Sequence, residues 1–174
     1  MTIKEILDDF KLKEEQEKKH WKELQEQTAQ QIEARIERLN RCFEEVILPS
    51  VRKVEKDLQG FGLWHKIHVG QTTSPNTGRQ NIQDVAFYFY PEKFQTNYHR
   101  QRLVDASYKA FFRPSGDYRK VALIIRFPQR LPQRVEMDED VHKVEDLSKE
   151  QVDSFLERFI KGALDAYQSD RLLL

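Results

Sequence analysis

The fold is decided by residues 11–59, which read KLKEEQEKKHWKELQEQTAQQIEARIERLNRCFEEVILPSVRKVEKDLQ. This stretch contains no glycine and a single proline, Pro49, and its apolar residues return at helical spacing. A straight helix of this length would measure on the order of 65–70 Å, since each residue adds about 1.5 Å. No domain built from the remaining residues is that wide, so we expect part of the helix to need another partner.

The middle of the predicted helix carries a heptad pattern. Over three heptads from Ala29 every seventh residue is apolar, and so is the residue three positions after each of them, which is the a and d pattern of a coiled-coil seam. The predicted oligomerisation residues are Ala29, Ile32, Ile36, Leu39, Phe43 and Val46. We predict that they pair with a second copy, as a homodimer, or with a partner helix.

The seam weakens toward the N-terminus, where Trp21, Leu24 and Thr28 fall one residue out of register. An alternative to self-association is a hairpin in which the amphipathic residues 2–10 fold back on the helix. On the C-terminal side the apolar stripe continues past Pro49. A proline removes one amide donor and presses on the preceding turn, so we expect a kink near Glu45 rather than an end.

Beyond Gly60 and Gly62 the apolar period changes from helical spacing to two, which is typical of strands. The predicted strands are Leu63–Val69, Asn81–Tyr90, Leu103–Arg113 and Arg119–Phe127, and the two alanines of the third leave a helix open there. The polar residues 129–146 are interpreted as a surface connection, in which residues 134–137 could form a short edge strand.

The C-terminal residues predict a helix with a defined start. Ser148 and Gln151 have the spacing of a capping box, and Leu147 and Val152 that of a hydrophobic staple. The apolar stripe that follows is wider than a coiled-coil seam, so this helix should pack on a sheet face.

These elements predict an α+β fold: a long N-terminal coiled-coil-like helix, a four-stranded, mainly antiparallel sheet, and a C-terminal helix packed on one sheet face. We place a helical stalk at residues 1–47 and a two-layer α+β domain at residues 48–174.

Composition excludes several functional classes. The 29 basic and 29 acidic residues cancel, which disfavours a dedicated nucleic-acid binder. The single cysteine, Cys42, excludes an intrachain disulfide. The acidic N-terminal residues do not form a secretory signal and no apolar run is long enough to span a membrane, so we expect a cytoplasmic protein without a membrane partner.

Catalytic and metal-binding patterns are not found either. His65 and His68 are the one close pair among the five histidines, and on a strand they point to opposite faces. No glycine-rich phosphate loop, HExxH or CxxC motif occurs. We therefore predict no catalytic residue, no metal site and no cofactor.

The sheet face away from the helices is predicted to be partly aromatic and bordered by arginines. Its possible partner-binding residues are Trp64, His68, Tyr88, Tyr90, Arg126 and Arg130. Such a face fits a partner surface or a platform for stacked bases, although exposed aromatic residues are also common on the wet face of a sheet.

The leading hypothesis is a non-enzymatic interaction or scaffold protein that self-associates through its long helix and presents the α+β domain to a partner. The first alternative is nucleic-acid binding through the aromatic and arginine-bearing sheet face. The second is a small-ligand binder or enzyme with a pocket between sheet and helices, which would need convergent polar groups there.

Overall fold

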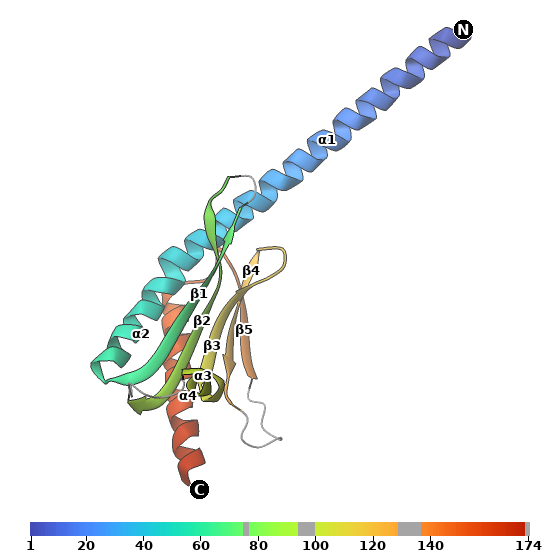
Figure 1. Ribbon diagram of the computed structural model, residues 1–174. Helices are drawn as coiled ribbons and strands as arrows, with labels where there is room; N and C mark the ends of the chain where they lie inside the picture. The colour runs from blue at the N-terminus through green and yellow to red at the C-terminus, as the bar shows by residue number, and fades with distance from the viewer. Residues whose placement is uncertain (75–76, 94–99, 129–136, 173–174) are drawn as a thin grey trace. The chain divides into compact units, whose positions relative to one another are not determined.

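The computed structural model describes residues 1–74, 77–93, 100–128 and 137–172. In chain order its helices are α1 (Ile3–Cys42), the π-helical turn η1 (Phe43–Ile47), α2 (Leu48–Gly60), α3 (Arg100–Ala106) and α4 (Lys149–Leu172). Its strands are β1 (Leu63–Thr73), β2 (Gln80–Lys93), β3 (Tyr108–Pro114), β4 (Lys120–Arg126) and β5 (Met137–Lys143). This is the predicted α+β class, with an antiparallel sheet and a C-terminal helix contacting it (Figure 1).

The chain divides into two compact units, Met1–Ile36 and Glu37–Leu174. The first is helical throughout from Ile3, and a capping box starts it: Glu5 N–H donates to Thr2 Oγ1 at 3.3 Å and Thr2 N–H to Glu5 Oε2 at 2.7 Å. The division falls before the predicted boundary between residues 47 and 48. The reason is that buried residues from Leu39 onward belong to the core of the second unit.

The sheet of the second unit is a meander in which the strands lie in the order β1-β2-β3-β4-β5 and each is antiparallel to the next. Its five strands exceed the predicted four by β5, which begins at Met137, the last residue of the proposed edge strand; residues 134–136 lie outside the described residues. The sequence MDEDVHK shows little apolar alternation. An edge strand can nevertheless form through its backbone pairing with β4, which sequence periodicity does not report.

The prediction of a strand over Leu103–Arg113 is wrong for the first half of this segment. Helix α3 ends at Ala106, and Ser107 closes it by donating its Oγ–H to the Val104 carbonyl at 2.6 Å. The strand begins only at Tyr108. The helix that the alanines left open is therefore present in this segment, and the β3–β4 hairpin around Ser115–Asp117 forms as predicted.

The distortion expected near Glu45 takes the form of η1, in which Leu48 N–H donates to the carbonyl of Phe43. The ring of Pro49 would collide with the carbonyl of Glu45 in a regular α-helix, and Pro49 offers no N–H to it. A wider π turn relieves this conflict without ending the helical run. The chain then continues as α2 to Gly60, and Gly62 turns out of it with a φ of +69°.

The core lies between one face of the sheet and the helices. Val85, Phe87 and Phe89 of β2 have no exposed surface, and the ring of Phe159 on α4 meets Phe87 and Phe89 edge-on at 5.9 and 6.5 Å. The buried side chain of Asn40 joins helix to sheet, because its Oδ1 accepts a hydrogen bond from Ile82 N–H at 2.8 Å. The capping box predicted at the start of α4 is confirmed. Ser148 N–H donates to Gln151 Oε1 at 2.9 Å, and Gln151 N–H donates to Ser148 Oγ at 3.2 Å.

Two of the predicted oligomerisation residues serve this core instead of an intermolecular seam. Leu39 is 2% exposed and Phe43 has no exposed surface. Both belong to the same cluster as Ile47 and Val51. The heptad pattern correctly marks the apolar side of the helix, but at these positions the sheet and α4 cover it.

We predict that Phe43→Ala lowers the free energy of unfolding of the second unit by about 3–5 kcal/mol, because it leaves a cavity under the sheet. Ile32→Ala, at a side chain that is 38% exposed, should change it by less than about 1 kcal/mol. Urea unfolding followed through the fluorescence of buried Trp64 measures both. Equal effects of the two substitutions would contradict the division of the chain at Ile36.

Candidate functional site

The candidate site is the sheet face opposite α2 and α4, which we call the open face. Paired residues of adjacent strands share a face, so the strand register defines rows across it. The first row is Lys66, Tyr88, Lys109 and Arg126, and the second is His68, Ala86, Phe111, Ile124 and Glu139. In the orientation of Figure 1 this face is turned toward the viewer, with α4 behind the strands.

Phe111 lies at the centre of the open face and is half-buried. The guanidinium carbons of Arg113 and Arg126 lie 4.5 and 5.6 Å from the centroid of its ring, and the ring of Tyr88 meets it edge-on at 6.5 Å. Each cation over a ring face contributes about 0.5–1 kcal/mol at an exposed site. Ile124, which is the strand partner of Phe111 on this face, is only 7% exposed.

The open face is basic, although the chain as a whole is neutral. Its cations are Lys66, Lys109, Arg113, Lys120, Arg126 and Lys143, and its carboxylates are Asp84 and Glu139. Lys109 is directly opposite Arg126, and Lys120 is opposite Lys143. Within the described part of the chain none of these lysines and arginines forms an ion pair. Two like-charged pairs are therefore directly opposite in the strand register, an arrangement that is generally destabilising.

Three of the predicted partner-binding residues lie on the open face. His68 and Arg126 are exposed and Tyr88 is half-buried, and Tyr88 and Arg126 both contact Phe111. Arg130 lies outside the described residues.

The prediction was wrong for Trp64 and Tyr90, which are 7% and 8% exposed and belong to the core. The ring of Tyr90 lies 6.4 Å from that of Tyr108 and 5.6 Å from that of Tyr167 on α4. The pairing of β1 with β2 shifts register between Leu63 and Trp64. Strict alternation of faces fails at such an irregularity.

Sequence reasoning missed Lys109, Phe111 and Arg113 as parts of this face. A signal was present, because Lys109, Phe111 and Arg113 alternate with the inward-facing Ala110 and Phe112. The inward-facing residues carry the apolar alternation, whereas the basic character of the face emerges only when four strands are placed side by side.

The remaining predicted oligomerisation residues differ in exposure. Ala29 and Ile32 are exposed, Ile36 is half-buried, and Val46 packs against the core of the second unit. Since the structure contains one copy of the chain, the pairing of Ala29, Ile32 and Ile36 with another helix stays a prediction.

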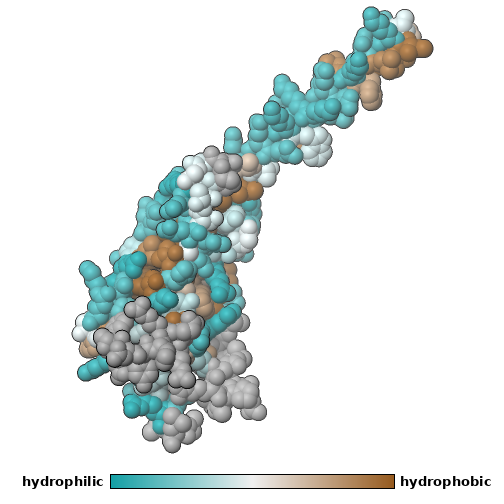
Figure 2. All heavy atoms as spheres, in the orientation of Figure 1, coloured by the Kyte–Doolittle hydropathy of each residue, from teal (hydrophilic) through white to brown (hydrophobic). Residues whose placement is uncertain are grey.

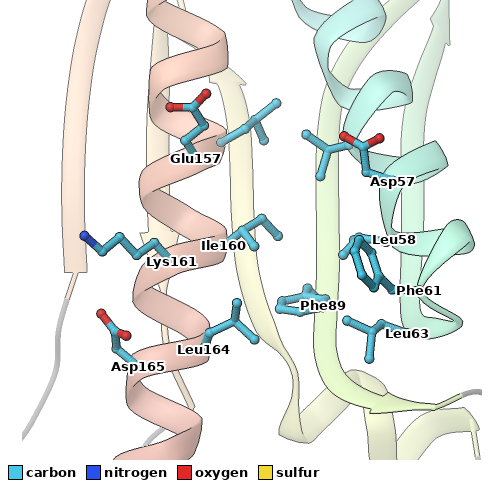
Figure 3. A pocket seen from close by; sticks show the side chains of 12 residues that line it. Asp57, Leu58, Phe61, Leu63, Phe89, Glu157, Ile160, Lys161, Leu164 and Asp165 are labelled. Atoms are coloured by element: carbon cyan, nitrogen blue, oxygen red, sulfur yellow. The ribbon is translucent and has the colours of Figure 1, made fainter.

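A groove of about 610 Å³ lies between α2 and α4 (Figure 3). Ile160 and Leu164 of α4 point across it toward Leu58 and Phe61, and Phe89 of β2 forms part of its lining. Lys161 and Asp165 point away from its interior. Convergent polar groups, which an enzyme pocket at this place would need, are not found among the described lining residues.

Other candidate chemical groups have structural partners. The Nδ1 atom of His65 lies 2.9 Å from the Leu63 carbonyl. His142 Nε2 approaches Asp140 Oδ2 at 3.1 Å on the edge strand, without the alignment of a hydrogen bond. Among the described residues no three histidine, cysteine or carboxylate groups gather to hold a metal ion. No described helix has the length and apolar composition that crossing a membrane requires.

Comparison with known proteins adds no relative: no family model, curated protein or solved structure matches the chain.

Cys42 gives a pH-dependent prediction. Burial raises the pKa of its thiol from an ordinary 9.0 to about 11. The folded protein should therefore react with iodoacetamide far more slowly at pH 8 than the urea-unfolded protein, as mass spectrometry can measure. The folded state holds the thiol proton more tightly than the unfolded state. The free energy of unfolding should therefore fall as pH rises from 9 toward 11. Equal reaction rates in the two states would contradict the burial.

The charge pairs give a second prediction. Lys109→Glu turns a like-charged pair with Arg126 into an opposite one, so the free energy of unfolding should rise by about 0.2–1 kcal/mol at low salt. The gain should shrink in about 1 M NaCl, where exposed charges are screened. Urea unfolding at both salt concentrations measures it, with Lys109→Gln as an intermediate control. A loss of stability at low salt would show that the repulsion is absent.

Proposed function

We propose that this is a non-enzymatic interaction protein that self-associates through the helix of its first unit and presents the α+β unit to a partner. The observation that carries the proposal is a row of large apolar side chains exposed on the first unit. Figure 2 shows several of them as brown atoms near the N-terminal end of α1.

The row follows the spacing of a coiled-coil seam. Ile3, Leu7 and Phe10 are 78%, 56% and 63% exposed, and Trp21 and Leu24 are 66% and 41% exposed. Counting by alternate steps of four and three from Ile3 reaches all five of them. Side chains of this size gain about 1.5–3 kcal/mol each when fully buried, so a second helix along this row would be stabilised.

Glu14 and Glu17 occupy the two seam positions between the apolar halves. Lysines surround them, since Lys11, Lys13 and Lys18 fall at the positions that flank the seam. Within the chain Lys18 reaches Glu14 at 3.7 Å and Lys13 reaches Asp9 at 3.2 Å, and all four side chains are largely exposed. In a pair of such helices the flanking lysines of one copy lie beside the seam glutamates of the other. This offsets the repulsion between glutamates of the two copies at positions 14 and 17.

This row also accounts for the register change that the sequence shows. Two consecutive steps of four lead from Thr28 to Ile32 and Ile36. The extra step of four shifts the row from Ile3 into the heptad register of Ile32 and Ile36. The proposed seam therefore runs over residues 3–36 and includes Ile32 and Ile36, with Ala29 next to Thr28 where the register changes, whereas Leu39 and Phe43 are excluded because they lie in the core.

The test is sedimentation equilibrium of the full chain and of a Trp21→Glu/Leu24→Glu variant over a wide concentration range. We expect the parent to associate and the variant to sediment as a monomer, because two charges then fall in the seam. The matched control is Gln16→Glu/Gln30→Glu, which adds the same charge on the opposite side of the helix and should leave association unchanged.

A parent chain that stays monomeric at all concentrations would refute the proposal. Equal dissociation of the control and the seam variant would show that net charge, rather than the apolar row, governs association.

A further inference from the structure

We propose that the open face binds single-stranded nucleic acid, with its lysines and arginines on the phosphates and its planar side chains against the bases. This inference concerns the second unit alone and does not rest on the self-association proposed above.

The cations of the open face are complementary in charge to a phosphate backbone. Lys66, Lys109 and Arg126 form one row across β1, β3 and β4, and Arg113 lies beside it over Phe111. Neighbouring strands lie about 4.8 Å apart, so Lys109 and Arg126 fall within one Debye length, about 8–10 Å, of each other, and Lys66, two strands from Lys109, lies at about that distance. A bound polyanion experiences this local field, which the zero net charge of the whole chain does not cancel.

The row also places two like charges at one cross-strand pair. Lys109 and Arg126 are directly opposite each other, and no carboxylate among the described residues pairs with either. A sheet selected only for stability would place opposite charges at such a pair. A phosphate between the two cations turns the repulsion into two favourable contacts.

The planar side chains of the open face favour nucleic acid over an acidic protein segment. An acidic peptide would need cations alone, but this face also presents flat groups: the ring of Tyr88, the imidazole of His68, and the guanidinium groups held on Phe111 by the contacts described above. Unpaired bases stack on aromatic rings and on arginine planes, at about 1–3 kcal/mol per base. A paired duplex hides its base faces and cannot use them.

The test is fluorescence anisotropy of fluorescein-labelled oligouridine and oligothymidine 12-mers titrated with the full chain at several salt concentrations. We expect saturable binding of one or both that weakens as salt rises. For Lys109→Gln/Arg126→Gln we expect binding at least tenfold weaker and a salt slope smaller by about 1.4, since each lost phosphate contact in a single strand accounts for about 0.7.

The matched control is Lys53→Gln/Lys56→Gln, which removes the same charge from exposed positions of α2. It should bind within about twofold of the parent, and thermal melting checks that both double variants fold. Tyr88→Leu should weaken binding without changing the salt slope, since it removes a stacking surface but no cation.

Several outcomes would overturn the inference. These are no saturable binding at low salt, equal weakening by the control, or competition by polyglutamate, duplex DNA or anionic vesicles as effective as that of unlabelled single strands. Effective competition by polyglutamate or by vesicles would assign the face to an acidic protein or to a lipid surface. The seam variant Trp21→Glu/Leu24→Glu should still bind the 12-mers, so failure of either proposal can be recognised separately.

Discussion

One constraint organises the second unit: the buried side of the helical run from Leu39 to Leu58 must keep facing the sheet across Pro49. Leu39, Phe43, Ile47 and Val51 follow at steps of four, and each such step in an α-helix overshoots a full turn by about 40°. The π turn η1 holds more residues per turn, so it reduces this drift where Pro49 already prevents regular α geometry. Phe43, Ile47 and Val51 consequently all lose their exposed surface in one core.

The same helix illustrates why apolar periodicity is an incomplete guide to partners. The heptad of Ala29 to Val46 and the row from Ile3 to Leu24 look alike in the sequence, but only the first runs into the core. The pattern reports which side of a helix avoids water, whereas what covers that side depends on residues distant in the sequence. Leu39 is covered by its own fold, and Leu7 is not.

The two faces of the sheet differ in what holds them in place. The inner face is held by aromatic packing, such as Phe112 on β3 against Phe155 on α4 at 5.3 Å. The open face keeps like charges opposite one another and an aromatic residue, Phe111, under two guanidinium groups. Local sequence preferences and the fold agree on the first face and conflict on the second, and such conflicts are expected where a surface serves something other than stability.

The sequence by itself determined the α+β class, the long helix, the capping box at Ser148 and the inward residues of β2, because each depends on neighbours within a few positions along the chain. The tertiary structure alone decided that Leu39 and Phe43 lie in the core, that Tyr90 turns toward α4, that Met137–Lys143 pairs as a fifth strand, and that the cations of separate strands meet on one face. These outcomes depend on strand register and on contacts between distant residues, and local periodicity carries no information about either.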